Sequence, residues 1–367
     1  MTSISLSRRL RRTPFSDGVE AAGVKGYTVY NRMLLPTVFR SLEEDYRHLK
    51  SAVQVWDVAV ERQIEVSGPD AARLMQLLTP RDLGRMQPDQ CFYIPVVNEQ
   101  GGMLNDPVTL RPDEDRWWIS IADSDLLFWV NGLAVGMGLE VRVHEPDVSP
   151  LAVQGPLADD LMARVFGEDA RAIRFFRHKR LAFGNTSFIV ARSGYSKQGG
   201  FEIYVEGSEH GMPVWNALFE AGRDLDVHAG GPNLIERIEG GLLSYGNDMT
   251  SDNTPFQCGL GKFCHLGEDQ PCIGAASLRA EKASGPTRQI RAVAVDGAPI
   301  TFTDRALPVT VDGAIAGQIT SVSWSPDHQT NVAIGMIDAA HWADGTSAQV
   351  ETLDGPRSAT IRTDFWA

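Results

Sequence analysis

Residues 192–204 read RSGYSKQGGFEIY, a polar segment with paired glycines that runs into an apolar strand. Side chains alternate along a strand, so Phe201 and Ile203 share one face while Glu202 and Tyr204 share the other. One interpretation makes the second face a solvated outer surface. The other interpretation places Glu202 in a cavity, where a carboxylate can accept two N–H bonds from a flat heterocycle.

An α+β block surrounds this segment. It is expected to contain a strand that ends in LAVQGP at 151–156, a helix from about Leu157, hairpin strands that meet at Gly184-Asn185, a strand over 201–205 and a helix over 214–219. The order of strand, helix, hairpin and helix predicts a compact α+β unit.

The preceding residues repeat this scheme. Ser41 and Glu44 form a capping-box pattern, which predicts a helix from about Leu42. The elements expected next are a strand with Ile64 and Val66, a helix with Leu74, Leu77 and Leu78, and antiparallel strands over 92–98, 107–111 and 117–121. The similar order of elements in the two blocks indicates two related α+β units.

The pattern of predicted elements changes after about Gly285. Short alternating strands are separated by turn signals at Asp312-Gly313, Ser325-Pro326 and Asp354-Gly355. This pattern predicts a C-terminal all-β barrel or roll. The preceding stretch, 268–285, is expected to be a connector.

A second polar constellation lies at 93–107, YIPVVNEQGGMLNDP. It predicts a strand, a glycine turn and a returning strand that begins with Asn105 and Asp106. Gly101-Gly102 can be an ordinary hairpin turn with a solvated strand start behind it. Alternatively, the amide and the carboxylate mark a site.

A third constellation lies at 233–248, NLIERIEGGLLSYGND. Leu234, Ile235 and Ile238 follow helical spacing, which predicts an amphipathic helix continuing to Leu242. The opposite face carries the ionisable residues Glu236, Arg237 and Glu239, for which surface ion pairing is the ordinary interpretation. Paired glycines inside a helix cost about 1 kcal/mol each relative to alanine, so they suggest close packing against backbone or ligand.

Composition excludes several classes of protein. The formal charge of −13 argues against a nucleic-acid surface, which needs clustered positive charge. No apolar run approaches the roughly 20 residues of a membrane span. Arginines 8, 9, 11 and 12 form a basic arm without a following apolar segment, so we expect no secretory signal.

Motifs for several common chemistries are missing. Four cysteines without a CxxC pair favour reduced thiols over a zinc site or a disulfide framework. The sequence has no P-loop, no GxGxxG after its first strand, no HExxH and no GxSxG. Kinase chemistry, hydride transfer and serine hydrolysis therefore lose support, and no metal is expected.

Taken together, the constellations resemble the folate-dependent T-protein family of the glycine cleavage system. The family's motifs match, in order, Tyr93 and the glycine turn, LAVQGP, RSGY followed by Gly-Phe-Glu, the Arg237-Ile238-Glu239 helix, and ITSVSWSP at 319–326. The likeness covers nearly the whole chain. Two departures argue against a true aminomethyltransferase: Lys197-Gln198-Gly199 replaces a second Gly-Glu-Asp, and Asn105 replaces the first Asp of a pair.

Within that superfamily the chain looks like the dimethylsulfoniopropionate (DMSP) demethylases, which use tetrahydrofolate as methyl acceptor. The segments that carry this likeness are SRRLRRTPF at 7–15, YTVYN at 27–31, WWISIADSD at 117–125, SKQGG at 196–200 and NLIERIE at 233–239. Tyr195 and Phe201 depart from the DMSP demethylase pattern, which has Trp and Tyr at these positions.

The resemblance implies an α+β fold, a three-domain cloverleaf with folate in its central channel. The expected domains are residues 1–60 with 149–265, residues 61–148, and a C-terminal β-barrel over 280–367.

Matching motifs also imply roles for individual residues. Glu202 corresponds to the glutamate that grips the pterin amide edge, Tyr93 and Tyr195 to residues that line the folate site, and Arg237 to the helix arginine near the cofactor. Asp106 corresponds to the aspartate beside the reactive folate nitrogens, and it is the expected catalytic residue. A family tryptophan is Lys262 here, followed by Phe263, which leaves ring stacking at that point open.

The implied reaction moves a methyl group from a sulfonium to N5 of tetrahydrofolate. Aromatic faces suit a cation that loses its charge on reaction, and the candidates are Tyr30, Trp56, Phe176 and Tyr195. Two alternatives stay open. The donor can be another onium zwitterion such as a betaine, or the chain can be a noncatalytic iron-sulfur assembly factor, which the segment around Cys264 partly matches. We expect a cytoplasmic enzyme that can form a homodimer.

Overall fold

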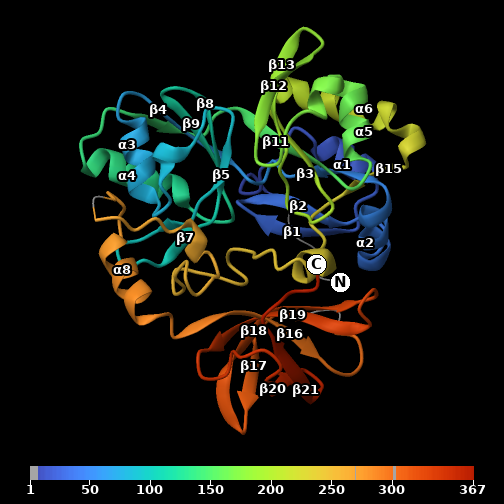
Figure 1. Ribbon diagram of the computed structural model, residues 1–367. Helices are drawn as coiled ribbons and strands as arrows, with labels where there is room; N and C mark the ends of the chain where they lie inside the picture. The colour runs from blue at the N-terminus through green and yellow to red at the C-terminus, as the bar shows by residue number, and fades with distance from the viewer. Residues whose placement is uncertain (1–6, 269, 301–302) are drawn as a thin grey trace. The chain divides into compact units, whose positions relative to one another are not determined.

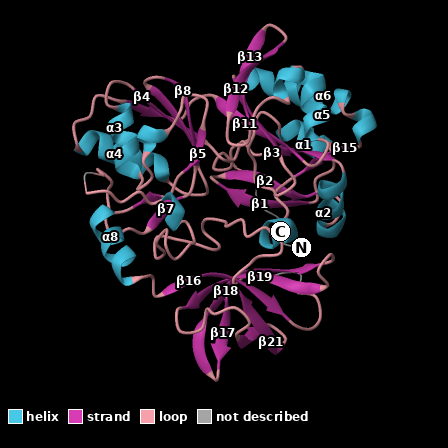
Figure 2. Cartoon of the chain, in the orientation of Figure 1, coloured by secondary structure: helices cyan, strands magenta, loops and turns pink. Residues whose placement is uncertain are grey.

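The computed structural model describes residues 7–268, 270–300 and 303–367 (Figure 1). The chain divides into two compact units. The first contains residues 1–72, 86–93 and 107–233, and the second contains residues 73–85, 94–106 and 234–367. Helices and strands alternate through most of the chain, and strands alone make up its C-terminal part (Figure 2).

A six-stranded sheet forms the centre of the first unit. Its order is β12 (His178–Phe183), β13 (Thr186–Ala191), β14 (Gly200–Glu206), β11 (Val148–Gln154), β3 (Val53–Asp57) and β15 (Val227–Gly230). Only the β15–β3 pair is parallel among these neighbours. The two central strands, β14 and β11, are buried along nearly their whole length.

Helices cover one face of this sheet. Apolar side chains of α1 (Ser16–Ala21), α5 (Ala158–Phe166) and α6 (Gly211–Ala221) pack against Phe201, Ile203 and Val205 of β14. Alternation therefore turns Glu202 and Tyr204 to the sheet's other face.

The first unit also holds a five-stranded antiparallel sheet. Its order is β10 (Arg142–His144), β4 (Gln63–Ser67), β9 (Arg116–Ser120), β8 (Val108–Asp113) and β5 (Cys91–Tyr93). Cys91, Leu110 and Trp118 of this sheet pack with Ala191 and Tyr204 of the six-stranded sheet. The five-stranded sheet therefore covers the face that carries Glu202 in the region of Ala191 and Tyr204.

The remaining elements of the first unit are shorter. They are the hairpin β1 (Gly26–Tyr30) and β2 (Met33–Val38), α2 (Leu42–Ser51) and α4 (Leu126–Gly136). Ser41 accepts a hydrogen bond from the Glu44 amide, which confirms the predicted start of α2. Helix α3 (Ala71–Leu78) crosses the boundary between the units.

The basic arm is tied to the first unit. Arg11 and Arg62 both pair with Glu145, and Arg12 pairs with Asp17 and Glu20. Thr13 Oγ1 donates a 2.5 Å hydrogen bond to Oδ2 of the buried Asp57.

The second unit contains a closed barrel, which confirms the predicted all-β C-terminal part. Its strands run in the order β16 (Arg288–Val295), β19 (Thr330–Asp338), β18 (Ala314–Ser325), β17 (Leu307–Val311), β20 (Ser347–Thr352) and β21 (Gly355–Arg362). Val293, Ile319 and Val350 belong to its apolar interior. Ile238 of α7 (Leu234–Glu239) packs on the outside with Ile290 and Ile334.

Two sequence predictions need correction. Residues 268–285 contain a helix, α8 (Ala275–Ser284), in place of a plain connector. The strand expected over 92–98 is two strands, β5 and β6 (Val96–Val97), because Pro95 has no N–H to continue the ladder. β6 pairs with β7 (Met103–Asn105) as the predicted glycine hairpin.

Helix α7 is shorter than its sequence pattern suggests. It ends at Glu239, and Gly241 follows with a φ of +64°. The Gly241 amide bonds to the Ile238 carbonyl and the Leu242 amide to the Arg237 carbonyl, a Schellman termination. The paired glycines therefore end the helix, whereas the sequence analysis placed them inside it.

Candidate functional site

Glu202 lies at the centre of the six-stranded sheet. Its neighbours across β14 are Ala152 on β11 and Ala191 on β13. Both alanines are small and buried, and each belongs to an apolar cluster beside the carboxylate. Only 6% of Glu202 is exposed, so the solvated-face interpretation is wrong.

Few hydrogen bonds compensate the Glu202 carboxylate for its burial. Ser193 Oγ donates a hydrogen bond to Oε2, and the described residues give this carboxylate no other hydrogen bond. Burial raises the pKa of the carboxyl, and the Ser193 hydrogen bond opposes that shift. A buried carboxylate with acceptor capacity left over suits a ligand that donates N–H groups.

The loop before β14 is shaped by Gln154. Its Nε2 donates to the Ser193 carbonyl at 3.2 Å, and its Oε1 accepts from Ser196 Oγ at 2.7 Å. A Cβ at Gly194 would lie 2.0 Å from Nε2, so only glycine lets the loop wrap this amide. The Gln-Gly-Pro strand end and the Arg-Ser-Gly-Tyr loop therefore fit together, and Tyr195 is placed by that fit.

Two aromatic clusters flank Glu202. Tyr195 packs with Trp56, Leu49 and Ala152, the neighbour of Glu202 on one side. Trp56 has no exposed surface, and its Nε1 donates to Gln54 Oε1 at 2.9 Å. Trp56 therefore supports Tyr195 within the core, and the half-buried Tyr195 is the ring that a ligand can reach.

Phe176 belongs to the cluster on the other side. It packs with Tyr204, Trp118 and Ala191, the second neighbour of Glu202. Its φ of +57° is rare for a bulky residue. Backbone hydrogen bonds hold this conformation, from Phe176 N to the Arg192 carbonyl at 2.9 Å and from Cys91 N to the Phe176 carbonyl at 3.0 Å. Such strain in a folded chain is typical of functional positions.

The other predicted tyrosines of the first unit lie in different places. Tyr93 ends β5 on the same sheet face as Cys91, whose pKa is raised by burial and also by the charge of Glu202. Tyr30 ends β1 and packs with Met33, Leu35 and Val60, a separate cluster. Cys91 and Tyr93 thus belong to the surroundings of Glu202, while Tyr30 is in a different cluster.

In the second unit, Asp106 directly follows β7. Asn105 before it is fully buried, and Asp106 is half-buried. The pKa of Tyr245 is raised, chiefly by burial and also by the charge of Asp106.

Arg237 is buried in α7, which corrects the expectation of a surface face. Its Nη1 contacts Asp248 Oδ2 at 2.8 Å and its Nη2 donates to Ser321 Oγ at 2.6 Å. Glu236 and Glu239 are buried as well, and Glu239 accepts from Ser325 at 2.6 Å. The polar side of α7 therefore faces the protein interior, including hydroxyls of the barrel.

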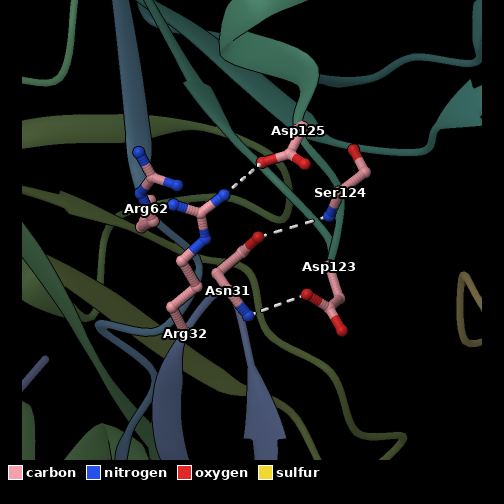
Figure 3. A pocket seen from close by; sticks show the side chains of 6 residues that line it. All are labelled: Asn31, Arg32, Arg62, Asp123, Ser124 and Asp125. Carbon is pink, nitrogen blue, oxygen red and sulfur yellow. Dashed lines mark hydrogen bonds and ion pairs between the residues drawn. The ribbon is translucent and has the colours of Figure 1, made fainter. Parts of the chain in front are cut away.

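A polar pocket of about 270 Å³ was not anticipated from the sequence. It is lined by Asn31, Arg32, Arg62, Asp123, Ser124 and Asp125 (Figure 3). Arg32 pairs with Asp125 at 3.4 Å, and the Asn31 amide donates to Asp123 at 2.7 Å. Asn31 and Arg32 adopt the left-handed conformation at the tip of the first hairpin. Asn favours this conformation, so Asn31 is the sequence signal for the turn beside the pocket.

His48, Asp226 and His228 also lie close together. Their ligand atoms lie within 4.8 Å of one another, and the two rings stack at 4.2 Å. Gln54 Nε2 lies 3.3 Å from His48 Nδ1, so the proton belongs on Nε2, which donates to the Asp226 carbonyl at 2.8 Å. This hydrogen bonding occupies the His48 nitrogen that a metal would need, and the cluster fastens α2 to the start of β15.

The four cysteines are free, buried thiols. Burial raises the pKa of Cys264 to about 12 and the pKa of Cys272 to about 12. Neither forms a thiolate near neutral pH. Of the described helices, none is long and apolar enough to cross a membrane.

Comparisons with known proteins agree with this architecture. The family model of the GCVT N-terminal domain matches residues 15–268, and that of the glycine cleavage T-protein C-terminal barrel domain matches residues 288–365. Dimethylsulfoniopropionate demethylase DmdA of Ruegeria pomeroyi is 62% identical over 366 residues, 100% of each chain. An aminomethyltransferase of Bacillus cereus is 28% identical over 351 residues, 93% of this chain and 94% of that protein.

The fold has a close counterpart among solved structures. The crystal structure of glycine cleavage system aminomethyltransferase T from Bartonella henselae matches with a TM-score of 0.86 and 22% identity, over 98% of each chain. The expected fold class, α+β domains followed by a β-barrel, is thereby confirmed.

Proposed function

Because the chain belongs to the glycine cleavage T-protein family, we propose that it is a tetrahydrofolate-dependent DMSP demethylase. The reaction moves one methyl group from the sulfonium of dimethylsulfoniopropionate to N5 of tetrahydrofolate. The S–CH₃ bond breaks and an N5–CH₃ bond forms, and N5 then loses its proton to water, so the products are methylmercaptopropionate, 5-methyltetrahydrofolate and a proton. The observation that carries this proposal is the 62% identity, over the full length of both chains, to DmdA of Ruegeria pomeroyi.

The surroundings of Glu202 fit a reduced pterin. The pterin edge offers a ring N–H and an amino group side by side, and a carboxylate accepts both. Glu202 has this capacity because Ser193 is its one hydrogen-bond donor among the described residues. Tyr195 and Tyr93, each half-buried, are proposed to line the ring. Arg237 is already engaged by Asp248, so we propose that it acts on the cofactor site by holding its surroundings.

Tetrahydrofolate, when bound, accepts the methyl group at N5. The sulfonium departs as a neutral thioether, so the reaction needs no general acid to expel the leaving group. The protein's main task is then to align two reactants. In well-oriented systems such alignment lowers the activation barrier by about 7 to 11 kcal/mol. Asp106 is proposed to orient the reacting nitrogen and to stabilise the positive charge that develops there.

The donor loses its positive charge as it reacts. A carboxylate in tight contact with the sulfonium would stabilise the ground state more than the transition state. Aromatic faces attract a cation more weakly, by roughly 0.5 to 2 kcal/mol. Phe176 and Tyr195, which flank Glu202 from two sides, are the residues that we propose for this role, and Tyr30 is a further candidate.

The domain boundaries are proposed as residues 1–60 with 149–265, residues 61–148 and residues 280–367. The sheets support this division, because β3 and β11 to β15 form one sheet while β4, β5 and β8 to β10 form another. A cytoplasmic location and a homodimer remain parts of the proposal.

One experiment tests the function directly. Purified protein is incubated with tetrahydrofolate and either DMSP or glycine betaine, and the folate product is identified by mass. We expect 5-methyltetrahydrofolate with DMSP and a much lower rate with glycine betaine. A higher rate with glycine betaine would reassign the donor. A methylene adduct with glycine-cleavage substrates would indicate aminomethyl transfer, and the absence of any folate product would indicate a binding role.

A further inference from the structure

The strand that leads to Asp106 is held by one loop of the second unit, residues 244–254. The Met103 amide donates to the Asn253 carbonyl at 2.8 Å. The Met103 carbonyl accepts from Tyr245 Oη at 3.1 Å. Both backbone polar groups of Met103 are therefore fixed by this loop, three residues before Asp106.

The same loop also packs tightly on the hairpin turn. A Cβ at Gly102 would lie 2.1 Å from the Ser251 carbonyl oxygen, closer than any side chain allows. The pKa of Tyr245 is raised, chiefly by burial and also by the charge of Asp106. A shift of loop 244–254 would therefore displace β7 and the aspartate that follows it.

Asp248 anchors the loop. Its side chain is fully buried. Oδ2 accepts from the Ser244 amide at 2.9 Å and from Arg237 at 2.8 Å. Oδ1 accepts from Thr320 Oγ1 at 2.7 Å and from Ser321 Oγ at 2.6 Å. Each carboxylate oxygen thus has two donors, a complete set for a buried charge.

The barrel supplies two of these donors through an irregular strand. Neighbouring residues of a regular strand point to opposite faces, so Thr320 and Ser321 could not normally reach one oxygen. The register of β18 with β19 shifts between Ile319 and Ser321. This bulge is what allows both hydroxyls to bond to Oδ1 of Asp248.

We propose that Asp248 is a positioning residue for Asp106, acting through loop 244–254 and Tyr245. Hydrogen bonds join the barrel hydroxyls to Asp248 and the loop to Met103, and the backbone of β7 links Met103 to Asp106. This inference rests on the proposed function, because it takes Asp106 as the residue that acts on the methyl transfer. The proposal gives the Thr320-Ser321 and Asn247-Asp248 motifs a role in positioning Asp106. Contact with the cofactor is not needed to explain these motifs.

Two variants interrupt this connection at different points. Tyr245→Phe removes only the hydroxyl that reaches Met103. Asp248→Asn replaces one carboxylate oxygen by an N–H₂ group, so either the two donors on Oδ2 (Ser244 amide and Arg237) or the two hydroxyls on Oδ1 lose their acceptor. We expect each variant to lower kcat by about tenfold while KM for both substrates stays within about twofold, the pattern of an interaction felt mainly in the transition state.

A double-mutant cycle separates positioning from general damage. In an Asp106→Ala background, Tyr245→Phe is expected to have no further effect on kcat, because the residue it positions is gone. Equal losses in both backgrounds, or a wild-type kcat for Tyr245→Phe, would overturn the inference. Ser325→Ala is the matched control: it removes a hydroxyl that contacts Glu239 at the same helix–barrel interface but lies outside the connection to β7. It is expected to lower Tm without changing kcat.

Amide hydrogen exchange supplies a readout that needs no activity. Asp248→Asn is expected to speed exchange of Met103, whose amide bonds to Asn253, while exchange in β14 stays unchanged. If the wild-type chain makes no 5-methyltetrahydrofolate, the proposed function fails and the exchange result still decides whether Asp248 holds β7. Unchanged exchange at Met103 would refute the connection, whatever the reaction.

Discussion

Ser193 Oγ donates a hydrogen bond to the buried carboxylate of Glu202. This contact joins the polar loop before β14 to the strand itself, nine positions later in the chain. One hydroxyl offsets only part of the desolvation of a buried carboxylate, and the pKa of Glu202 stays raised. A bound donor of two N–H groups would complete the compensation, which makes Glu202 the most direct test of folate binding.

Replacing Glu202 by Gln should weaken folate binding by roughly 100-fold. The amide offers one acceptor and one donor group where the pterin edge needs two acceptors, and an unmade bond to a charged group costs about 1.5 to 3 kcal/mol. Calorimetry with 5-formyltetrahydrofolate measures the change. Glu206→Gln, at the end of the same strand and paired with Arg180, is the control and should leave the Kd unchanged. A wild-type Kd for Glu202→Gln would remove Glu202 from the site.

Replacing Asp106 by Ala should lower kcat by about 100-fold and leave the folate Kd within threefold. The loss corresponds to about 2.7 kcal/mol of transition-state stabilisation, a usual value for one electrostatic partner. Stopped assays that quantify 5-methyltetrahydrofolate measure the rate. The exposed Asp113→Ala serves as control. Full turnover in Asp106→Ala would exclude a catalytic role for this carboxylate.

Phe176→Leu and Tyr195→Leu should each raise KM for the sulfonium donor by about 3-fold to 30-fold, since each removes an aromatic face worth roughly 0.5 to 2 kcal/mol to a cation. The folate Kd of Phe176→Leu should change less than its donor KM. Phe175→Leu is the matched control, because Phe175 is adjacent but 76% exposed. Equal KM values for Phe175→Leu and Phe176→Leu would count against the aromatic site.

Asp57 should make the stability of the first unit fall as pH rises from about 4 to 6. Burial raises its pKa from 3.8 to about 6, so in this window the folded chain keeps a proton that the unfolded chain releases. Asp57→Asn should remove this part of the slope, an effect on the order of 2 kcal/mol between pH 4.5 and 7. Thermal unfolding at both pH values measures it. The same slope in both proteins would show that Asp57 does not titrate in this window.

Cys264→Ser should leave methyl transfer unchanged. The thiol is buried and its pKa is raised to about 12, so it supplies no thiolate for metal or cluster chemistry at neutral pH. Parallel assays of 5-methyltetrahydrofolate formation compare the variant with the unaltered chain. A specific loss of activity with unchanged Tm would revive the iron-sulfur alternative.

Local patterns predicted most of the secondary structure. The Ser41 cap, the alternation around Glu202 and the turn at Asp312-Gly313 each depend on neighbours in sequence, and each appears as expected. Helix α8 was missed because its mixed polar and small residues carry no strong apolar stripe. The break at Pro95 was missed because a strand on either side of it looks continuous until the two pairing partners are known.

The chemical environment of the candidate residues was harder to predict. Arg237 looked like a surface residue because its neighbours in the helix are charged, but its partners Asp248 and Ser321 come from a loop and a barrel strand. Ser321 is 84 positions away in the chain. The positive φ of Phe176 also has no local signal, since backbone partners on two other segments impose it. Long-range hydrogen bonds of this kind become visible only in the fold.

The closed barrel constrains how the chain is made. β16, the first barrel strand along the chain, is hydrogen-bonded to β21, the last one. The ribosome therefore makes the closing strand after the other five, and the barrel of a nascent chain stays open until β21 has emerged. A premature stop just after β20 would leave β16 and β20 as uncovered edges, ready to pair with other chains. Quality control of this protein should accordingly be sensitive to truncations that remove β21.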